Sequence, residues 1–458
     1  MASNAFRTPL IRYVSTRGRS SQSAAAAPAC TRDICLSSVK LLNKSVATAV
    51  DYLSPTSRVT VAFKAGSRYE PPNELGISHV LRSAAGLSTK NASSFIIARK
   101  LAQIGASVSV SGDRENIYYT LETSQEHVTW AYEIFNNIIS NQEFRPWELL
   151  DNIPRLKFDL ASIPPQVLAV DLLHKAAYRR GLGNSLYVDP IKISKISSES
   201  LHHYMCNTMT PNRCCITVVA GSQECASSIA DALQLPHYKK ESEGTASTYS
   251  GGDLRQDTGG DLAHVAIALQ GAPASSPASL ALAIAAKALG SGPVTKWGAD
   301  NTPLARAIGN IGPFAAAGFN VSYSDSGLFG VIMSVPKDEA VVAVKNAASV
   351  LKNPQLTDDA ICAGKKALKL QVLSEGDCGT LFAESLSTQV LTTGEAKKPS
   401  AIALEIDQIP NSEVHRVTQA RRTACADWWI TPGTAGMRPR DLFTTSRDYR
   451  ESVGVIFH

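Results

Sequence analysis

Residues 61–91 decide the fold class, and they read VAFKAGSRYEPPNELGISHVLRSAAGLSTKN. Val61, Phe63 and Ala65 alternate with smaller or charged residues, which predicts a strand over residues 59–65 with one buried face. Two prolines at positions 71 and 72 mark a loop, and a helix is predicted over residues 77–85. A strand that leads through a short loop into a helix is the first unit of this fold.

The same order of elements occurs twice along the chain. The first set of predicted elements comprises strands at 45–50, 59–65, 107–110 and 117–121 and helices at 77–85, 93–104 and 126–139. The second set comprises strands at 263–269, 317–323 and 328–335 and a helix at 278–289. Leu304-Ala305-Arg306 repeats Ile97-Ala98-Arg99 at an offset of 207 residues, and Ile311-Gly312 repeats Ile104-Gly105 at the same offset. The matching order predicts an internal duplication.

The predicted fold class is α+β, because hairpin-connected strands and helices occur in blocks. We expect two homologous α+β domains, each a mixed or antiparallel sheet with helices on one face, which together form a clamshell. Residues 239–260 are rich in Ser, Thr, Gly and charge, as linkers are. The predicted divisions are 1–35 for a leader, 36–244 for the first domain and 245–458 for the second.

The first 32 residues have the composition of an organelle transit peptide. They contain five arginines and no acidic residue, and Ser and Ala dominate the rest. Phe6, Leu10 and Val14 are spaced to share one face of a helix. A basic disordered tail is the alternative interpretation. A mitochondrial transit peptide followed by a cleavage site near residues 19–27 is the prediction.

Composition excludes several classes of protein. The chain has 458 residues, 45 Lys+Arg and 40 Asp+Glu, and without residues 1–30 it has 41 basic and 40 acidic residues. A nearly neutral chain has no basic stripe to neutralise nucleic-acid phosphates. No apolar run approaches the ~18 residues that span a bilayer. The nine Cys have no C-x-x-C pair, which argues against a disulfide scaffold or a zinc ribbon.

The segment His79-Val80-Leu81-Arg82-Ser83, behind the Ala65–Glu70 strand end, resembles the motif region of one known family. P-loop, dinucleotide-binding and serine-hydrolase motifs do not occur in the chain. The chain resembles the family of the mitochondrial processing peptidases and the complex III core proteins, which are relatives of zinc peptidases with an inverted motif. The resemblance extends over residues 36–415. Further segments that carry it are 89–95, 114–116, 143–148, 177–179, 184–187, 251–255 and 323–330.

In that family, the helix carries H-x-x-E-H: two His bind zinc, the Glu is the general base, and a later Glu is the third ligand. Here His79 matches the first His, but Arg82 replaces the base and Ser83 replaces the second His. Counting 76 residues onward places the third ligand position at Asp159. Arg cannot accept a proton and would repel Zn²⁺. We therefore expect no catalytic residue, no metal site and no cofactor, with His79 as an ordinary helix histidine.

The resemblance implies a non-catalytic core subunit of the ubiquinol–cytochrome c reductase (complex III), on the matrix side of the mitochondrial inner membrane. It also implies a role in assembly and stability within a dimeric complex. The implied partners are core protein 1, cytochrome b, cytochrome c1 and the Rieske iron-sulfur protein, of which the last three carry the electrons.

Two alternatives remain, and one segment bears on the first of them. This alternative is the non-catalytic, substrate-binding subunit of the processing peptidase, which has a glycine-rich loop. The corresponding segment here, residues 288–293, has only two glycines, which favours the core subunit. A zinc peptidase in its own right is the least favoured alternative.

The chain changes character after about residue 420. This tail contains Trp428 and Trp429 and six Arg but no Lys. The family ends with a helix and a closing strand, and neither is clear here. We therefore predict an atypical tail that derives from an alternative or frame-shifted terminal exon.

Overall fold

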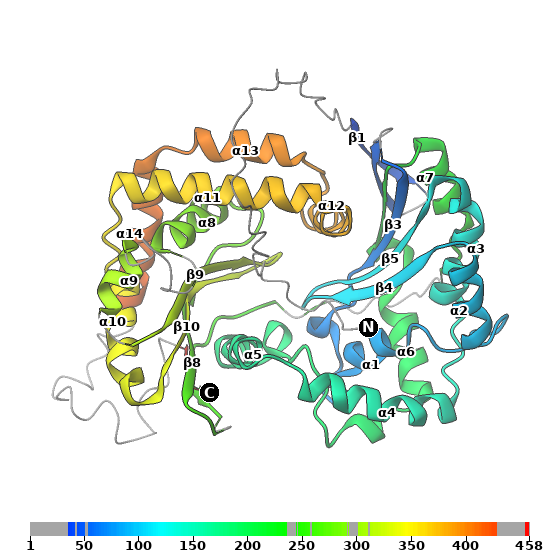
Figure 1. Cartoon of the computed structure of the whole chain (residues 1–458), viewed down its shortest axis with the longest axis horizontal. Helices are drawn as coiled ribbons and strands as arrows, with labels where there is room; N and C mark the ends of the chain where they lie inside the picture. Colours follow the sequence, from blue (N-terminus) through cyan, green and yellow to red (C-terminus); the bar gives the residue numbers. More distant parts are fainter. Residues whose placement is uncertain are drawn as a thin grey trace, which may run out of the picture.

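The computed structural model describes residues 35–41, 44–50, 54–235, 244, 246–256, 259–290, 292, 301–309, 312–427 and 454–457. These residues form two sheets, one in each half of the chain, with helices packed around them (Figure 1). Residues 1–34 of the predicted leader 1–35 lie outside the described residues, as do Ser291 and Pro293 of the segment 288–293, whereas Cys35 begins the first strand.

The first half contains a six-stranded sheet in the order β1-β2-β6-β3-β5-β4. Its strands are β1 (Cys35–Leu41), β2 (Lys44–Val50), β3 (Thr56–Phe63), β4 (Ser107–Gly112), β5 (Ile117–Ser124) and β6 (Cys214–Val219). Its helices are α1 (Ile77–Ala84), α2 (Ser94–Gln103), α3 (Val128–Ser140), α4 (Pro146–Ala161), α5 (Pro165–Tyr178), α6 (Ser198–Thr208) and α7 (Gln223–Ala232). The pairs are antiparallel except that β6 runs parallel to β2.

The second half contains a five-stranded sheet in the order β7-β11-β8-β10-β9. Its strands are β7 (Leu254–Arg255), β8 (Leu262–Gln270), β9 (Ala315–Ser322), β10 (Gly327–Pro336) and β11 (Gly454–Phe457). Its helices are α8 (Pro277–Leu289), α9 (Pro303–Ile308), α10 (Ala340–Lys352), α11 (Asp358–Asp377), α12 (Gly379–Thr393), α13 (Pro399–Gln408) and α14 (Asn411–Asp427). The pairs are antiparallel except that β11 runs parallel to β7.

Apart from β1, which has no counterpart in the described second sheet, the two sheets have the same topology, which confirms the predicted α+β class. Strand β11 lies between β7 and β8 as β6 lies between β2 and β3, parallel to one neighbour and antiparallel to the other. The predicted strands and helices of both halves are present within a few residues of their expected bounds. A closing helix and a closing strand, which the sequence does not show clearly, are present as α14 and β11. The part of the predicted atypical tail at 428–453, with Trp428 and Trp429, lies outside the described residues. The four residues of β11 are too few to show the alternation typical of a strand, so the sequence does not reveal it. Its antiparallel pairing with β8 defines this strand.

Each half contributes one helix to the other half's sheet. Helix α12 of the second half packs on β3 and β6, and α5 of the first half packs on β8 (Figure 1). The helices predicted on one face of each sheet are therefore complemented, on the other face, by a helix from the opposite half. This exchange is the main difference from the predicted architecture.

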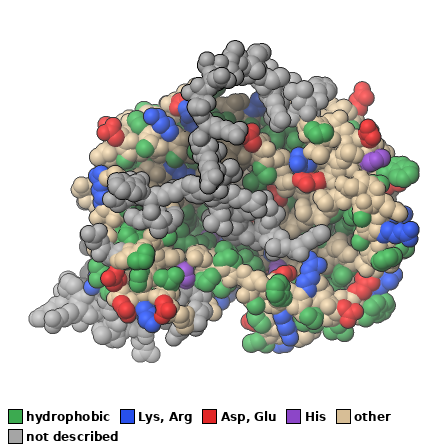
Figure 2. Space-filling model, in the orientation of Figure 1, with side chains coloured by type: hydrophobic (Ala, Val, Ile, Leu, Met, Phe, Trp, Pro, Cys, Tyr) green, Lys and Arg blue, Asp and Glu red, His purple; other side chains and the backbone are tan. Residues whose placement is uncertain are grey.

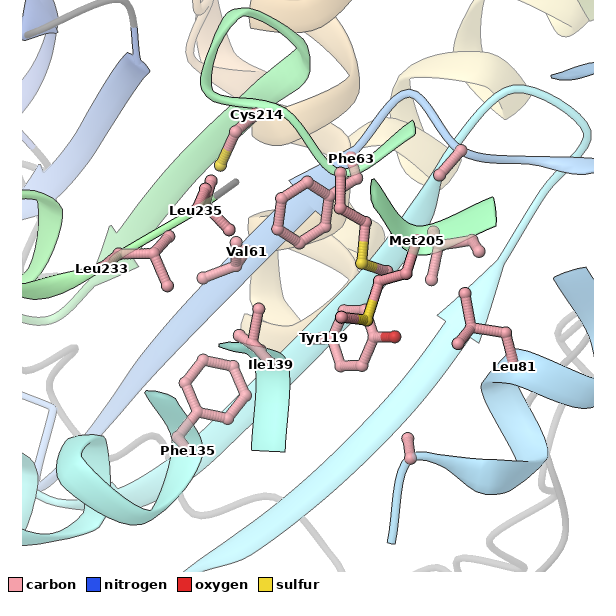
Figure 3. Packing of buried hydrophobic residues seen from close by; sticks show 14 of the residues in the cluster. Val61, Phe63, Leu81, Tyr119, Phe135, Ile139, Met205, Cys214, Leu233 and Leu235 are labelled. Carbon is pink, nitrogen blue, oxygen red and sulfur yellow. The ribbon is translucent and has the colours of Figure 1, made fainter. Parts of the chain in front are cut away.

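Alternation along β3 explains how the sheet buries both faces. Val59, Val61 and Phe63 point into the core that α1, α3 and α6 cover, and Figure 3 shows Val61 and Phe63 among residues of that core. Ala62, on the opposite face, packs against Val390 of α12. A small side chain on this face lets α12 approach the sheet closely. In the second half Ala266 and Ala268 of β8 form the corresponding contact with α5.

Among the described helices, none combines the length and apolar character needed to cross a bilayer.

Candidate functional site

Helix α1 carries the motif residues, and its beginning is fixed by two features of the preceding loop. Gly76 has a φ of 93°, and a Cβ added there would lie 2.5 Å from Cα of Val188. Only glycine fits this combination of conformation and space. The Glu70 carboxylate accepts hydrogen bonds from the backbone N–H groups of Gly76 (2.8 Å) and Ser78 (2.9 Å). Burial nevertheless raises the pKa of Glu70 to about 7.

His79 is a buried, neutral histidine. Its Nδ1 accepts a hydrogen bond from the backbone N–H of Val188 (3.3 Å), and its ring lies edge-on to Tyr187 with centroids 5.6 Å apart. Burial and the nearby Arg82 lower the pKa of His79 to about 3. A neutral ring that accepts at Nδ1 carries its proton on Nε2. In this tautomer neither ring nitrogen offers a lone pair to a metal.

Arg82 occupies the place of the family's general base and is part of the protein interior. Its Nη2 donates to the backbone carbonyl of Leu186 (2.8 Å), and its Nε donates to the carbonyl of Ser78 (3.3 Å). Burial lowers the pKa of Arg82, while the carboxylates of Glu70 and Asp113 oppose that shift. A guanidinium stays charged in proteins and has no lone pair for a proton. It therefore joins α1 to the loop at residue 186 and cannot activate water.

Ser83 completes the motif and contacts a residue that the sequence interpretation missed. Its Oγ accepts a hydrogen bond from Nδ2 of Asn152 on α4 (2.9 Å). Asp159, the predicted third position, lies seven residues further along α4, which is about 10 Å of helix. The structure therefore brings His79, Arg82 and Ser83 together and places Asn152 opposite Ser83.

These side chains do not fit a hydrolytic zinc. Such a site needs three protein ligands and a base beside an open position. The region offers one neutral histidine whose Nδ1 is engaged, a serine, an amide and a buried cation. Within the part of the chain that the structure describes, no group of three or more His, Cys, Asp or Glu side chains could hold a metal.

Comparison with known proteins gives this geometry its context. Residues 38–189 match the insulinase family (peptidase family M16), and residues 195–368 match the peptidase M16 inactive domain. The chain belongs to the M16 peptidase family. This M16 chain lacks the hydrolytic groups at α1 and is a non-catalytic homologue of the peptidases.

Among individual M16 relatives, the chain is 33% identical over 409 residues to human mitochondrial cytochrome b-c1 complex subunit 2, covering 88% of this chain and 90% of the relative. It is 26% identical to the mitochondrial-processing peptidase subunit alpha of Solanum tuberosum, covering 80% of this chain and 76% of the relative. The structure resembles a chain of complex III2 from Candida albicans with Inz-5 bound, with a TM-score of 0.69 and 19% identity. That match covers 84% of this chain and 92% of the other and shows a common fold.

Proposed function

We propose that this chain is a non-catalytic core subunit of the mitochondrial cytochrome b-c1 complex (complex III) and supports the assembly and stability of that complex. The similarity to subunit 2 of this complex over 88% of the chain carries the proposal. The geometry at α1 agrees with it, because Arg82 bridges α1 to Leu186 where a peptidase would hold water and metal.

The chain is mitochondrial, as its subunit 2 relatives are. Within the mitochondrion we place it at the inner membrane, on the matrix side. Its proposed partners there are core protein 1, cytochrome b, cytochrome c1 and the Rieske iron-sulfur protein. In this arrangement the chain itself holds no redox cofactor and contributes surface and rigidity.

An exposed apolar stripe on α4 supports a role in assembly. Trp147, Leu150 and Phe158 are 61%, 62% and 71% exposed and follow one side of the helix. The buried residues of α4, Asn152 and Leu156, lie on the opposite side. Neighbouring exposed apolar side chains mark a surface that a partner covers. The stripe therefore suits burial against another subunit of a large complex.

The proposal is tested in cells where this chain replaces the cell's own copy. Mildly solubilised mitochondria are separated by blue-native electrophoresis and probed for this chain and for cytochrome c1. We expect both in one large complex. The double variant Trp147→Ser/Phe158→Ser should lower the amount of that complex, whereas Arg155→Ala, an exposed control on another side of α4, should not.

The second candidate is the substrate-binding subunit of a processing peptidase, favoured by the 26% identity to subunit alpha of that enzyme. In that case the chain would migrate as a small soluble heterodimer, separate from cytochrome c1. This outcome would replace the first proposal and make binding of presequence peptides the next measurement.

A further inference from the structure

Corresponding hairpin turns of the two halves meet at the centre of the molecule. The turn between β4 and β5, residues 113–116, faces the turn between β9 and β10, residues 323–326 (Figure 1). Both turns contain an aspartate, Asp113 in the first and Asp325 in the second. The two aspartates have different hydrogen-bond partners. Asp113 accepts hydrogen bonds from its own turn, at the backbone N–H groups of Glu115 and Asn116, whereas Asp325 reaches across to the other half.

Arg68 is the residue on which the two turns converge. It lies in the short 3-10 helix Ser67–Tyr69 that follows β3, and its side chain is only 6% exposed. Its Nη1 donates to Glu115 (2.6 Å) in its own half and to Asp325 (2.9 Å) in the other. Its Nη2 donates to the second oxygen of Asp325 at 2.5 Å. The two bonds to Asp325 form a bidentate, charge-assisted pair, which is both strong and directional.

Glu115 and Asp325 reinforce this crossing from both sides. Glu115 accepts hydrogen bonds from the backbone N–H (3.1 Å) and the hydroxyl (2.6 Å) of Ser324. Asp325 accepts one from the backbone N–H of Ser247, which lies between the halves in sequence (2.9 Å). The guanidinium holds the pKa of Asp325 below its ordinary value, although partial burial opposes the shift. The second half therefore satisfies buried polar groups of the first half, those of Arg68 and Glu115.

Helix α5 is hydrogen-bonded to residues at the turn between β9 and β10. The Tyr178 hydroxyl donates to the carbonyl of Gly327 (2.9 Å), and the Tyr323 hydroxyl lies 2.8 Å from Nε2 of His174. An ion pair between Arg114 and Asp171 (2.6 Å) ties α5 back to the first turn. Separation of the two turns would therefore weaken the packing of α5 against the second sheet.

The arrangement is one-sided despite the duplication. At the offset of 207 residues, Arg68 corresponds to Ser275, which is exposed. The first half thus supplies the arginine of this ion pair, Arg68, and the second half supplies its aspartate, Asp325. Arg68 is buried, whereas the Asp325 side chain is one-third exposed. Loss of Asp325 leaves the guanidinium paired with Glu115, but loss of Arg68 leaves the largely buried Glu115 carboxylate without this cation and is costly.

We propose that Arg68, Glu115 and Asp325 form a lock that keeps the two halves of this chain closed on each other. The lock holds the two turns together and keeps α5 seated on β8. A chain without it would open transiently between α5 and the second sheet while each half retained its own core. This inference concerns the chain itself and holds whichever complex contains it.

Hydrogen–deuterium exchange of the full chain tests the lock through three reporter regions. These are the turn 323–327, the α5 residues 169–178, and β3 within the first half's own core. In Arg68→Met, exchange in the turn and in α5 should rise at least tenfold, and exchange in β3 should stay unchanged. Arg145→Met removes a half-exposed ion pair with Glu143 within the first half and is the matched control. It should leave all three regions as in the unmodified chain.

Asp325→Asn removes the charge but keeps the side-chain size, and it guards against general unfolding. If Arg68→Met raises exchange in β3 as well, that variant cannot separate opening from general unfolding, and Asp325→Asn is used instead. It should raise exchange in the turn and in α5 and leave β3 unchanged. In the double variant Arg68→Met/Asp325→Asn, exchange in the turn and in α5 should lie within about threefold of that in the faster single variant. Both substitutions break the same contact, so their effects should not add. Faster exchange in the turn alone, with α5 unchanged in both variants, would overturn the proposal.

Discussion

Replacement of Arg82 measures whether α1 is a structural site. In Arg82→Met the carbonyl of Leu186 loses its part-buried donor, which costs about 1–3 kcal/mol. Removal of a buried cation offsets part of that cost, because the guanidinium is desolvated in the folded state. We expect a net loss of about 0–2 kcal/mol in the free energy of unfolding.

Arg82→Glu restores the residue type of the family's general base and should be much worse. The carboxylate would lie near Glu70 and Asp113, whose charges now favour the guanidinium. It would also face the Leu186 carbonyl, an acceptor without a donor. An uncompensated buried charge costs about 3–5 kcal/mol. The free energies of unfolding of the two variants should therefore differ by at least about 1 kcal/mol.

Urea unfolding of the full chain, followed by circular dichroism, gives both free energies on one scale. Arg145→Met, at the surface of the same half, should change stability by less than about 1 kcal/mol. If Arg82→Glu is as stable as Arg82→Met, the pocket accepts an acid without penalty. In that case the assignment of Arg82 to the structural interior is wrong.

Three further predictions concern α12, Glu70 and Gly76. Phe382→Ala on α12 should lower the free energy of unfolding in urea by about 3–5 kcal/mol, because this buried side chain packs the exchanged helix against the first sheet. The control Leu370→Ala, at a side chain that is 71% exposed, should lower it by less than about 0.5 kcal/mol. Glu70 has a folded-state pKa of about 7 against an ordinary 4.5, so it favours the folded state below pH 4.5 and loses that contribution, about 3 kcal/mol, as pH rises to 7. Urea midpoints at pH 4.5 and 8 should show this decline in the unmodified chain and less of it in Glu70→Gln. Gly76→Ala should lower the thermal midpoint, because a Cβ would meet Val188 at a φ of 93°; an unchanged midpoint in calorimetry would contradict that geometry.

Periodicity predicted four strands and three helices of the first half and three strands and one helix of the second, but not the other elements that the structure describes. Alternation in residues 59–65 predicted β3, which spans Thr56–Phe63, and the repeat at 207 residues predicted the second set. The alternation is a local signal within one strand, and the repeat compares two segments 207 residues apart, so neither requires knowledge of tertiary contacts. The replacement of the base by Arg82 was also visible in the sequence, because a motif position can be read without knowing its neighbours.

The contacts of these residues could not be predicted in the same way. Counting from Ser83 pointed to Asp159, whereas Asn152 makes the contact, because a fixed count ignores insertions before or within α4. The exchange of α5 and α12 left only a faint trace, the alanines at positions such as Ala62 and Ala266. A small residue in a strand does not say which distant helix fills the space beside it.

The changes at α1 and the contacts between the halves point to the same kind of protein. Peptide hydrolysis needs an accessible metal, a base and room for substrate, and here Arg82 joins α1 to Leu186 across the place of the base. Opening between the halves would break the pair between Arg68 and Asp325 and unseat the exchanged helices. With the proposed lock closed, such a chain keeps one shape and lacks the hydrolytic groups at α1. A fixed shape with exposed apolar residues on α4 is what a complex needs from a subunit that positions others.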